Sequence, residues 1–103
     1  YKKMRVLKVL TNNNIIDCAV LSYASYTRKE EQLTFKVVFN GEQRFKLSKK
    51  EIILYPDSFI CMPSGTIYES TISAHEPIKT LSISISSDFL KDFQNRFFLP
   101  NFQ

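Results

Sequence analysis

Short runs of β-favouring residues, each ended by turn residues, recur along this chain and constrain its fold more than any other feature. Residues 52–55, 59–62 and 67–72 are such runs, and Pro56 and Pro63 begin the segments that separate them. Strands that alternate with proline turns at this spacing are typical of an antiparallel sandwich or barrel. With 103 residues, 44% of them hydrophobic and 23% charged, the chain is long enough for one globular domain. The sequence therefore predicts one mostly β domain.

The first third of the chain adds further strands. Residues 4–10 and 15–23 are β-favouring and flank a run of asparagines, which tolerate turn conformations. Residues 25–32 are polar without an apolar period and predict an exposed loop. From Leu33 the pattern alternates strictly. Leu33, Phe35, Val37 and Phe39 would face the core, with Thr34 and Lys36 on the opposite face.

The Asn40–Gly41 dipeptide predicts a tight reversal after this strand, because both central positions of the favoured hairpin turn need positive φ. A strict two-residue turn would mix the two faces. We therefore expect a bulge or longer loop at Gly41 that returns Phe45 and Leu47 to the core side.

The last elements are a strand and a helix. Leu81, Ile83 and Ile85 alternate with serines, which predicts a strand with one face inward. Ser86, Ser87 or Asp88 can then cap a helix whose apolar stripe consists of Phe89, Leu90, Phe93 and Phe97. The stripe either closes the barrel or pairs with another chain or the next domain. Five of the nine phenylalanines follow Asp88, which favours pairing, so we expect a homodimer.

The sequence offers little to build a catalytic or metal site. The single histidine, His75, is expected in a turn between strands, and no general base and orienting group can be assembled around a serine. Two glycines cannot supply a phosphate-binding loop. We therefore predict no catalytic residues, no metal and no cofactor.

Charge and cysteine use bear on partners and location. The net charge of +4 comes from a basic N-terminal tip, while the rest of the chain is balanced, which argues against a broad DNA-binding face. Cys18 and Cys61 show no CxxC spacing, so free thiols in a reducing cytoplasm are expected, with a single disulfide as the alternative. No run approaches the roughly 20 apolar residues of a membrane span, so no membrane association is expected.

Two segments resemble the motifs of the cupins, which are small double-sheet jelly rolls. Residues 38–42, Val-Phe-Asn-Gly-Glu, resemble the end of the first cupin motif, and Asp57 followed by residues 63–68, Pro-Ser-Gly-Thr-Ile-Tyr, keeps the spacing of the second. Asp57 stands where the family has glycine, Tyr68 where it has a metal-binding histidine, and Thr34 where it has glutamate. The resemblance thus implies a cupin-like double-stranded β-helix, or jelly-roll barrel, without the metal ligands.

Residues 33–97 as a whole are similar to the N-terminal domains of AraC-type transcription regulators, including the pattern of a last strand that runs into a helix. The resemblance implies a sensing barrel over residues 1–86 and the start of a helical dimerisation or linker region over 87–103. It further implies that a helix-turn-helix domain beyond Gln103 binds DNA and that the barrel binds a small effector, such as a sugar.

For the effector we expect core-facing side chains of the barrel, foremost Tyr68, whose position points into the cupin cavity. The other candidates are Phe35, Val37, Phe45 and Tyr23, since aromatic faces stack on rings and a tyrosine hydroxyl can orient a ligand. Plain core packing is the alternative for Phe35, Val37 and Phe45. The rival functions are a metal-independent cupin enzyme, such as a sugar isomerase or epimerase, and a purely structural dimerisation domain.

Overall fold

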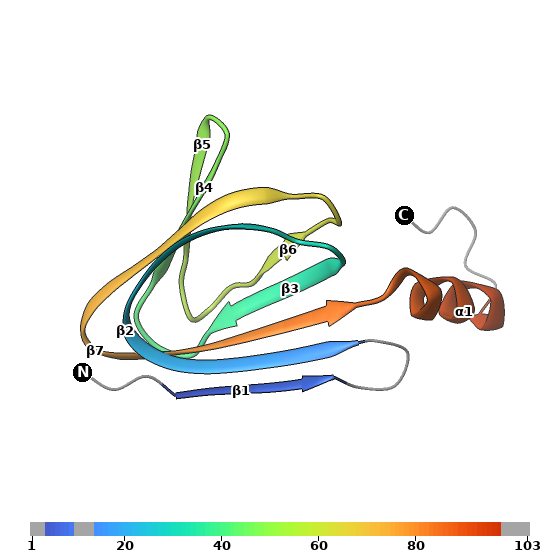
Figure 1. Ribbon diagram of the computed structural model, residues 1–103, viewed down its shortest axis with the longest axis horizontal. Helices are drawn as coiled ribbons and strands as arrows, with labels where there is room; N and C mark the ends of the chain where they lie inside the picture. The colour runs from blue at the N-terminus through green and yellow to red at the C-terminus, as the bar shows by residue number, and fades with distance from the viewer. Residues whose placement is uncertain (1–3, 10–13, 98–103) are drawn as a thin grey trace.

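The computed structural model describes residues 4–9 and 14–97, which form seven antiparallel strands and one helix (Figure 1). The elements are β1 (Met4–Val9), β2 (Ile15–Lys29), β3 (Leu33–Val38), β4 (Gln43–Leu47), β5 (Lys50–Leu54), β6 (Ile60–Met62), β7 (Ile67–Ile85) and α1 (Ser87–Phe97).

The long strand β7 organises the sheet. The strand order is β1-β2-β7-β3-β6, and β4 pairs with both β5 and β7. β2 pairs with β7 along almost its whole length, while β3 pairs with residues 80–85 of β7 and β4 with residues 69–71. In Figure 1 the β4–β5 hairpin projects from one side of the sheet, and α1 extends past the end of β7.

A bulge bends the β2–β7 ribbon in its middle. Leu21 pairs with Ile78, but Tyr23 pairs with Ser73, so residues 74–77 of β7 lie opposite a single residue of β2. Pro77 lies within this stretch, where its missing N–H breaks no ladder hydrogen bond. Bulges increase bending and twist. The two halves of the ribbon therefore curl toward each other and give the sheet a concave inner face.

The turn at Asn40–Gly41 is present, but it does not join a hairpin. β3 pairs with β6 and β7, whereas β4 pairs with β5 and β7. The Asn40 side chain instead fixes the turn to β7: its amide donates to the carbonyl of Pro77 (2.9 Å) and its oxygen accepts from the N–H of Lys79 (2.9 Å). Gly41 adopts a φ of +68°. A longer connection of this kind returns Phe45 and Leu47 to the core side, as expected.

Two sequence-based element predictions are wrong. The polar residues 25–29 belong to β2 rather than to a loop, and His75 lies within the continuous strand β7 rather than in a turn. Pairing between β2 and β7 satisfies the backbone of both segments, so neither needs an apolar period to remain extended.

The orientation predicted for β3 is also wrong. Its burial alternates with Thr34, Lys36 and Val38 buried, while Phe35 and Val37 are only partly buried on the opposite face. The outer position of Phe35 is stabilised by Phe59, whose ring lies 6.2 Å away. The buried apolar core consists of Leu21, Val38, Phe45, Leu54, Met62, Tyr68, Ile72 and Ile78.

The helix begins as predicted. The hydroxyl oxygen of Ser86 accepts a hydrogen bond from the N–H of Phe89 (3.2 Å), so Ser86 is the N-cap. The side-chain oxygen of Asn14 accepts from the N–H of Ser86 (2.8 Å) and ties this end of the helix to the start of β2.

Candidate ligand-binding site

The inner face of the curled sheet carries a buried ion pair. Nζ of Lys36 lies 3.2 Å from Oε2 of Glu30, and the two side chains are only 8% and 7% exposed. Lys36 is in the middle of β3, and Glu30 directly follows β2. Backbone hydrogen bonds position Glu30 against the turn before β7: its N–H donates to Thr66 (2.9 Å), and its carbonyl accepts from Gly65 (2.7 Å). A buried charge needs such a fixed partner.

Tyr68 completes this cluster. Its hydroxyl donates to the same oxygen, Oε2 of Glu30, at 2.7 Å, and the Lys36 ammonium lies 5.4 Å from the centre of its ring. Burial, and then the hydrogen bond to Glu30, raise the pKa of Tyr68 well above its usual range. The tyrosine is therefore a neutral donor that stabilises the carboxylate. Phe45 packs edge-on against the ring, with centroids 5.6 Å apart.

Neighbouring polar side chains extend the cluster along the inner face. Nζ of Lys36 donates to Oγ of Ser82 at 3.2 Å. Thr34 and Ser84 share a hydrogen bond of 2.9 Å, and Nε2 of Gln43 donates to Oγ of Ser70 at 2.8 Å. The serines of residues 82 and 84 thus lie on the same face as Lys36 and Thr34, so the apolar side chains between them lie on the outer face.

A cavity of about 300 Å³ opens beside Lys36. Its lining comes from both halves of the bent ribbon and from β3 and β4. It consists of Asp17, Ala19, Leu21, Ala24, Tyr26, Arg28, Lys36, Gln43, Ile72, Thr80, Leu81 and Ser82. The volume is at the lower end of the range for small-molecule sites. An apolar side and a few convergent polar groups are the usual composition of such a site.

None of the five predicted ligand residues belongs to the lining of this cavity. Tyr68 and Phe45 are buried behind it, and Tyr68 acts on it through Glu30 and Lys36. Phe35 and Val37 lie on the outer face, so the expectation that they face the core is wrong. Tyr23 follows the bulge and is 61% exposed.

Sequence reasoning missed the residues that lie closest to the cavity. Alternation with apolar residues predicts solvated positions for Lys36 and Ser82, and no pattern singles out Gln43. Arg28 was placed in a loop. The available signal was a lysine in the centre of an apolar strand, which is tolerated inside a domain when a carboxylate can reach it.

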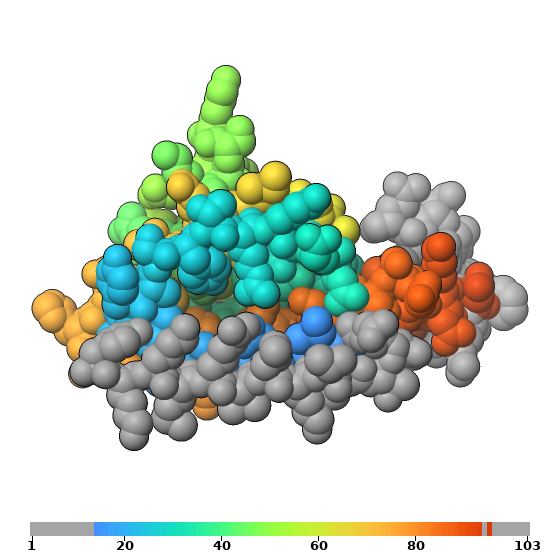
Figure 2. Space-filling model, in the orientation of Figure 1, coloured from blue at the N-terminus to red at the C-terminus, as the bar shows by residue number. Residues whose placement is uncertain are grey.

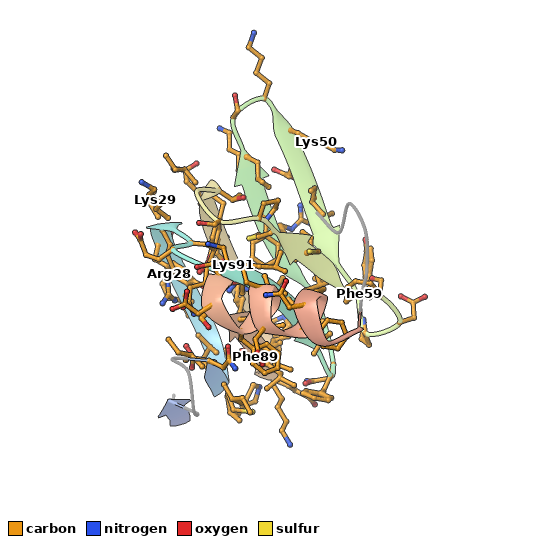
Figure 3. All side chains as sticks on the ribbon, turned by 90° about the vertical axis from the view of Figure 1, so that its right-hand side faces the viewer. Arg28, Lys29, Lys50, Phe59, Phe89 and Lys91 are labelled. Atoms are coloured by element: carbon orange, nitrogen blue, oxygen red, sulfur yellow. The ribbon has the colours of Figure 1, made fainter. Side chains whose placement is uncertain are left out.

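The predicted dimerisation residues lie on α1, which extends past one end of the sheet (Figures 1 and 2). Phe89 and Phe93 are each 38% exposed, and Leu90 is partly buried. The side chain of Phe97 lies outside the described part of the chain. Figure 3, which views α1 from the side, shows Phe89 beneath the helix, with Arg28 and Phe59 to either side of it.

Two further features concern metals and membranes. Within residues 4–9 and 14–97, no group of three or more histidine, cysteine, aspartate or glutamate side chains could hold a metal ion. In the same residues, α1 is too short and too polar to cross a bilayer.

No model of a known protein family matches this sequence, and no curated protein does. Several solved structures are similar to it in fold. A candidate mannose-6-phosphate isomerase from Ralstonia eutropha JMP134 has a TM-score of 0.72 at 10% identity, over 84% of this chain and 86% of that one. A cupin superfamily protein from Desulfitobacterium hafniense DCB-2 has a TM-score of 0.68 at 15% identity, over 82% and 77%.

A third similar structure is the cupin domain of an XRE family transcriptional regulator from Enterobacter cloacae. Its TM-score is 0.65 at 16% identity, and the match covers 82% of this chain and 96% of that one. At identities this low the likeness concerns the fold alone. The AraC-type resemblance has no counterpart among these three structures.

Proposed function

We propose that this chain senses a small molecule for an AraC-type transcription regulator. Its fold is that of a cupin domain, a mostly β curled sheet with a short C-terminal helix, as the sequence predicts. In this proposal the effector occupies the cavity beside Lys36 without a metal ion or other cofactor. The domain itself performs no catalysis. A helix-turn-helix domain beyond Gln103 binds DNA, and the protein acts in the cytoplasm.

The observation that carries the proposal is the position of the buried ion pair next to a cavity. Replacing a buried ion pair by apolar residues is often neutral or stabilising, so Lys36 and Glu30 are weak candidates for a purely structural role. Tyr68 belongs to the same cluster, and a strongly raised pKa beside a cleft is typical of functional sites. A domain whose interior served only dimerisation would be expected to fill this space with side chains.

The regulator role draws on the fold and on α1. The cupin domain from Enterobacter cloacae belongs to a transcriptional regulator, which is an example of this fold in that setting. Phe89 and Phe93 expose apolar rings on α1, which extends past one end of the sheet. Such rings suit a helix that pairs with a second copy of the chain.

A ligand screen tests the sensing role. We expect at least one class of small polar metabolite, sugars included, to raise the melting temperature of the 103-residue chain saturably. Lys36→Met combined with Glu30→Gln should abolish that shift, while Lys50→Met at the exposed tip of the β4–β5 hairpin should leave it unchanged (Figure 3). If no compound from a broad panel binds, the sensing role is excluded.

The regulator role has its own test in the source organism. The coding sequence downstream of Gln103 should continue for about a hundred residues with two helix-turn-helix patterns. A protein that ends near Gln103 would refute this part of the proposal.

A metal-independent enzyme is the second candidate function, and one observation favours it. Glu30 shares one carboxylate oxygen with the hydroxyl of Tyr68 and the ammonium of Lys36, so proton donors and an acceptor lie together beside the cavity. The Ralstonia protein is named as a candidate sugar-phosphate isomerase. Turnover of mannose 6-phosphate by the purified chain, abolished in Lys36→Met/Glu30→Gln, would establish the enzyme and reject the purely sensory role.

A further inference from the structure

Two hydrogen-bond donors at the cavity have no acceptor among the described residues. The ammonium of Lys36 has three N–H groups, and two of them are directed to the oxygens of Glu30 and Ser82. The Tyr68 ring, whose centre lies 5.4 Å from the ammonium, accepts no hydrogen bond at that distance. Ser82 accepts from Lys36 through its hydroxyl oxygen, which leaves its own hydrogen to donate. Both residues line the cavity. The site thus presents an N–H and an O–H from groups 3.2 Å apart.

We propose that this pair of donors binds the carboxylate of a small organic acid, an inference that rests on the sensing role and names its ligand class. A carboxylate has two oxygens in one plane and can accept from two adjacent donors at once. One of the donors here is a cation, and charge-assisted hydrogen bonds of this kind are shorter and stronger than neutral ones.

The charges that line the cavity agree with an anionic ligand, whereas the cluster as a whole, with Glu30, is balanced. The lining contains two cations, Lys36 and Arg28, against one carboxylate, Asp17. Glu30 is not part of the lining. It lies behind Lys36, and the hydroxyl of Tyr68 stabilises its charge from the other side. A ligand carboxylate on the cavity side of Lys36 would therefore contact the ammonium directly. The ammonium would lie between that carboxylate and Glu30.

The rest of the lining limits the body of the acid. Leu21, Ala24 and Ile72 line the cavity from β2 and β7 next to the bulge, and Ala19 and Leu81 add further apolar lining. Gln43 and Thr80 contribute polar side chains. In about 300 Å³ this arrangement suits a short, partly apolar acid rather than a phosphorylated sugar, which is larger and has no apolar part to match the apolar lining.

Matched pairs of compounds test the inference without altering the protein. Butanoate, hexanoate and benzoate would be titrated into the 103-residue chain by calorimetry at neutral pH, alongside their amides and inorganic phosphate. We expect at least one acid to bind saturably and its amide at least about tenfold more weakly, because the amide lacks the charge that Lys36 recognises. Equal binding of an acid and its amide would overturn the inference, as would a preference for phosphate.

Two variants assign the donors. Ser82→Ala removes one neutral hydroxyl and should weaken binding of the acid by about tenfold. Lys36→Met/Glu30→Gln removes the charge pair together and should abolish binding, whereas Lys50→Met is the control and should bind as the unaltered chain does. Full affinity in both site variants would show that the acid binds elsewhere and would reject the site.

The panel also separates this inference from the proposed function. If neutral sugars or other uncharged metabolites bind and every carboxylate fails, the ligand class is wrong but the sensing role stands. If nothing binds, both fail.

Discussion

The Lys36–Glu30 pair offers the sharpest test of how the interior is stabilised. Lys36→Met keeps the length of the side chain but leaves the Glu30 carboxylate 7% exposed, with only the Tyr68 hydroxyl as a described side-chain partner. Breaking a buried pair from one side costs about 3–5 kcal/mol, because the remaining charge stays desolvated. Removing both charges together avoids that penalty.

The expected magnitudes are large for a domain of this size. A total stability of about 5–15 kcal/mol means that Lys36→Met removes a large fraction of the free energy of unfolding. Since 1 kcal/mol shifts the melting temperature of a small domain by about 4–8 °C, the variant should melt at least about 12 °C lower. Lys36→Met/Glu30→Gln should recover at least about 2 kcal/mol of the loss.

Urea denaturation followed by far-ultraviolet circular dichroism measures these differences without screening the pair by salt. Lys50→Met is the control for loss of an exposed lysine and should stay within about 0.5 kcal/mol of the unaltered chain. A double variant as unstable as Lys36→Met alone would refute the reasoning, because the loss would then come from packing. Unchanged stability of Lys36→Met would also refute the reasoning, because the ion pair would then be well solvated.

Three further predictions concern separate parts of the molecule. Burial and a carboxylate partner raise the pKa of Tyr68, so its contribution to stability is present below about pH 10 and declines as the pH rises further. Tyr68→Phe should therefore show a shallower alkaline loss of stability in urea titrations than the unaltered chain. Gly41→Ala should destabilise by about 1–3 kcal/mol and by more than Gly65→Ala, because both positions have positive φ but only at Gly41 would a Cβ meet a β7 side chain. If α1 pairs two copies, Phe89→Ser/Phe93→Ser should convert a dimer to a monomer in light scattering, and an unchanged mass would exclude the helix as the interface.

Features set by local chemistry could be predicted from the sequence. Ser86 caps α1 because its short hydroxyl reaches the N–H of Phe89, a relation that depends on only a few residues. Gly41 adopts positive φ in a turn, as the Asn-Gly dipeptide indicates. Pairing partners are a non-local property. The same turn therefore could not show that β3 would pair with β6 and β7 rather than with β4.

The length of β2 and β7 could not be predicted for a related reason. Residues 25–29 have no apolar period because Tyr26 and Arg28 line the rim of the cavity, where a polar side chain is partly solvated. Composition alone assigns such a segment to a loop. Its extended conformation comes from the ladder with residues 67–71 of β7, more than thirty residues further along the chain.

The reversed orientation of β3 has the same origin as the candidate site. Alternation separates two faces of a strand, but it identifies the inner face only when the interior is apolar throughout. Here the interior holds a charge pair, and a bond to the turn at Gly65 sets the position of Glu30. Lys36 can therefore point inward while Phe35 packs against Phe59 on the outer face. The rule that the apolar face of a strand points inward fails at Lys36, where the interior is not purely apolar. Departures of that kind are expected at functional sites.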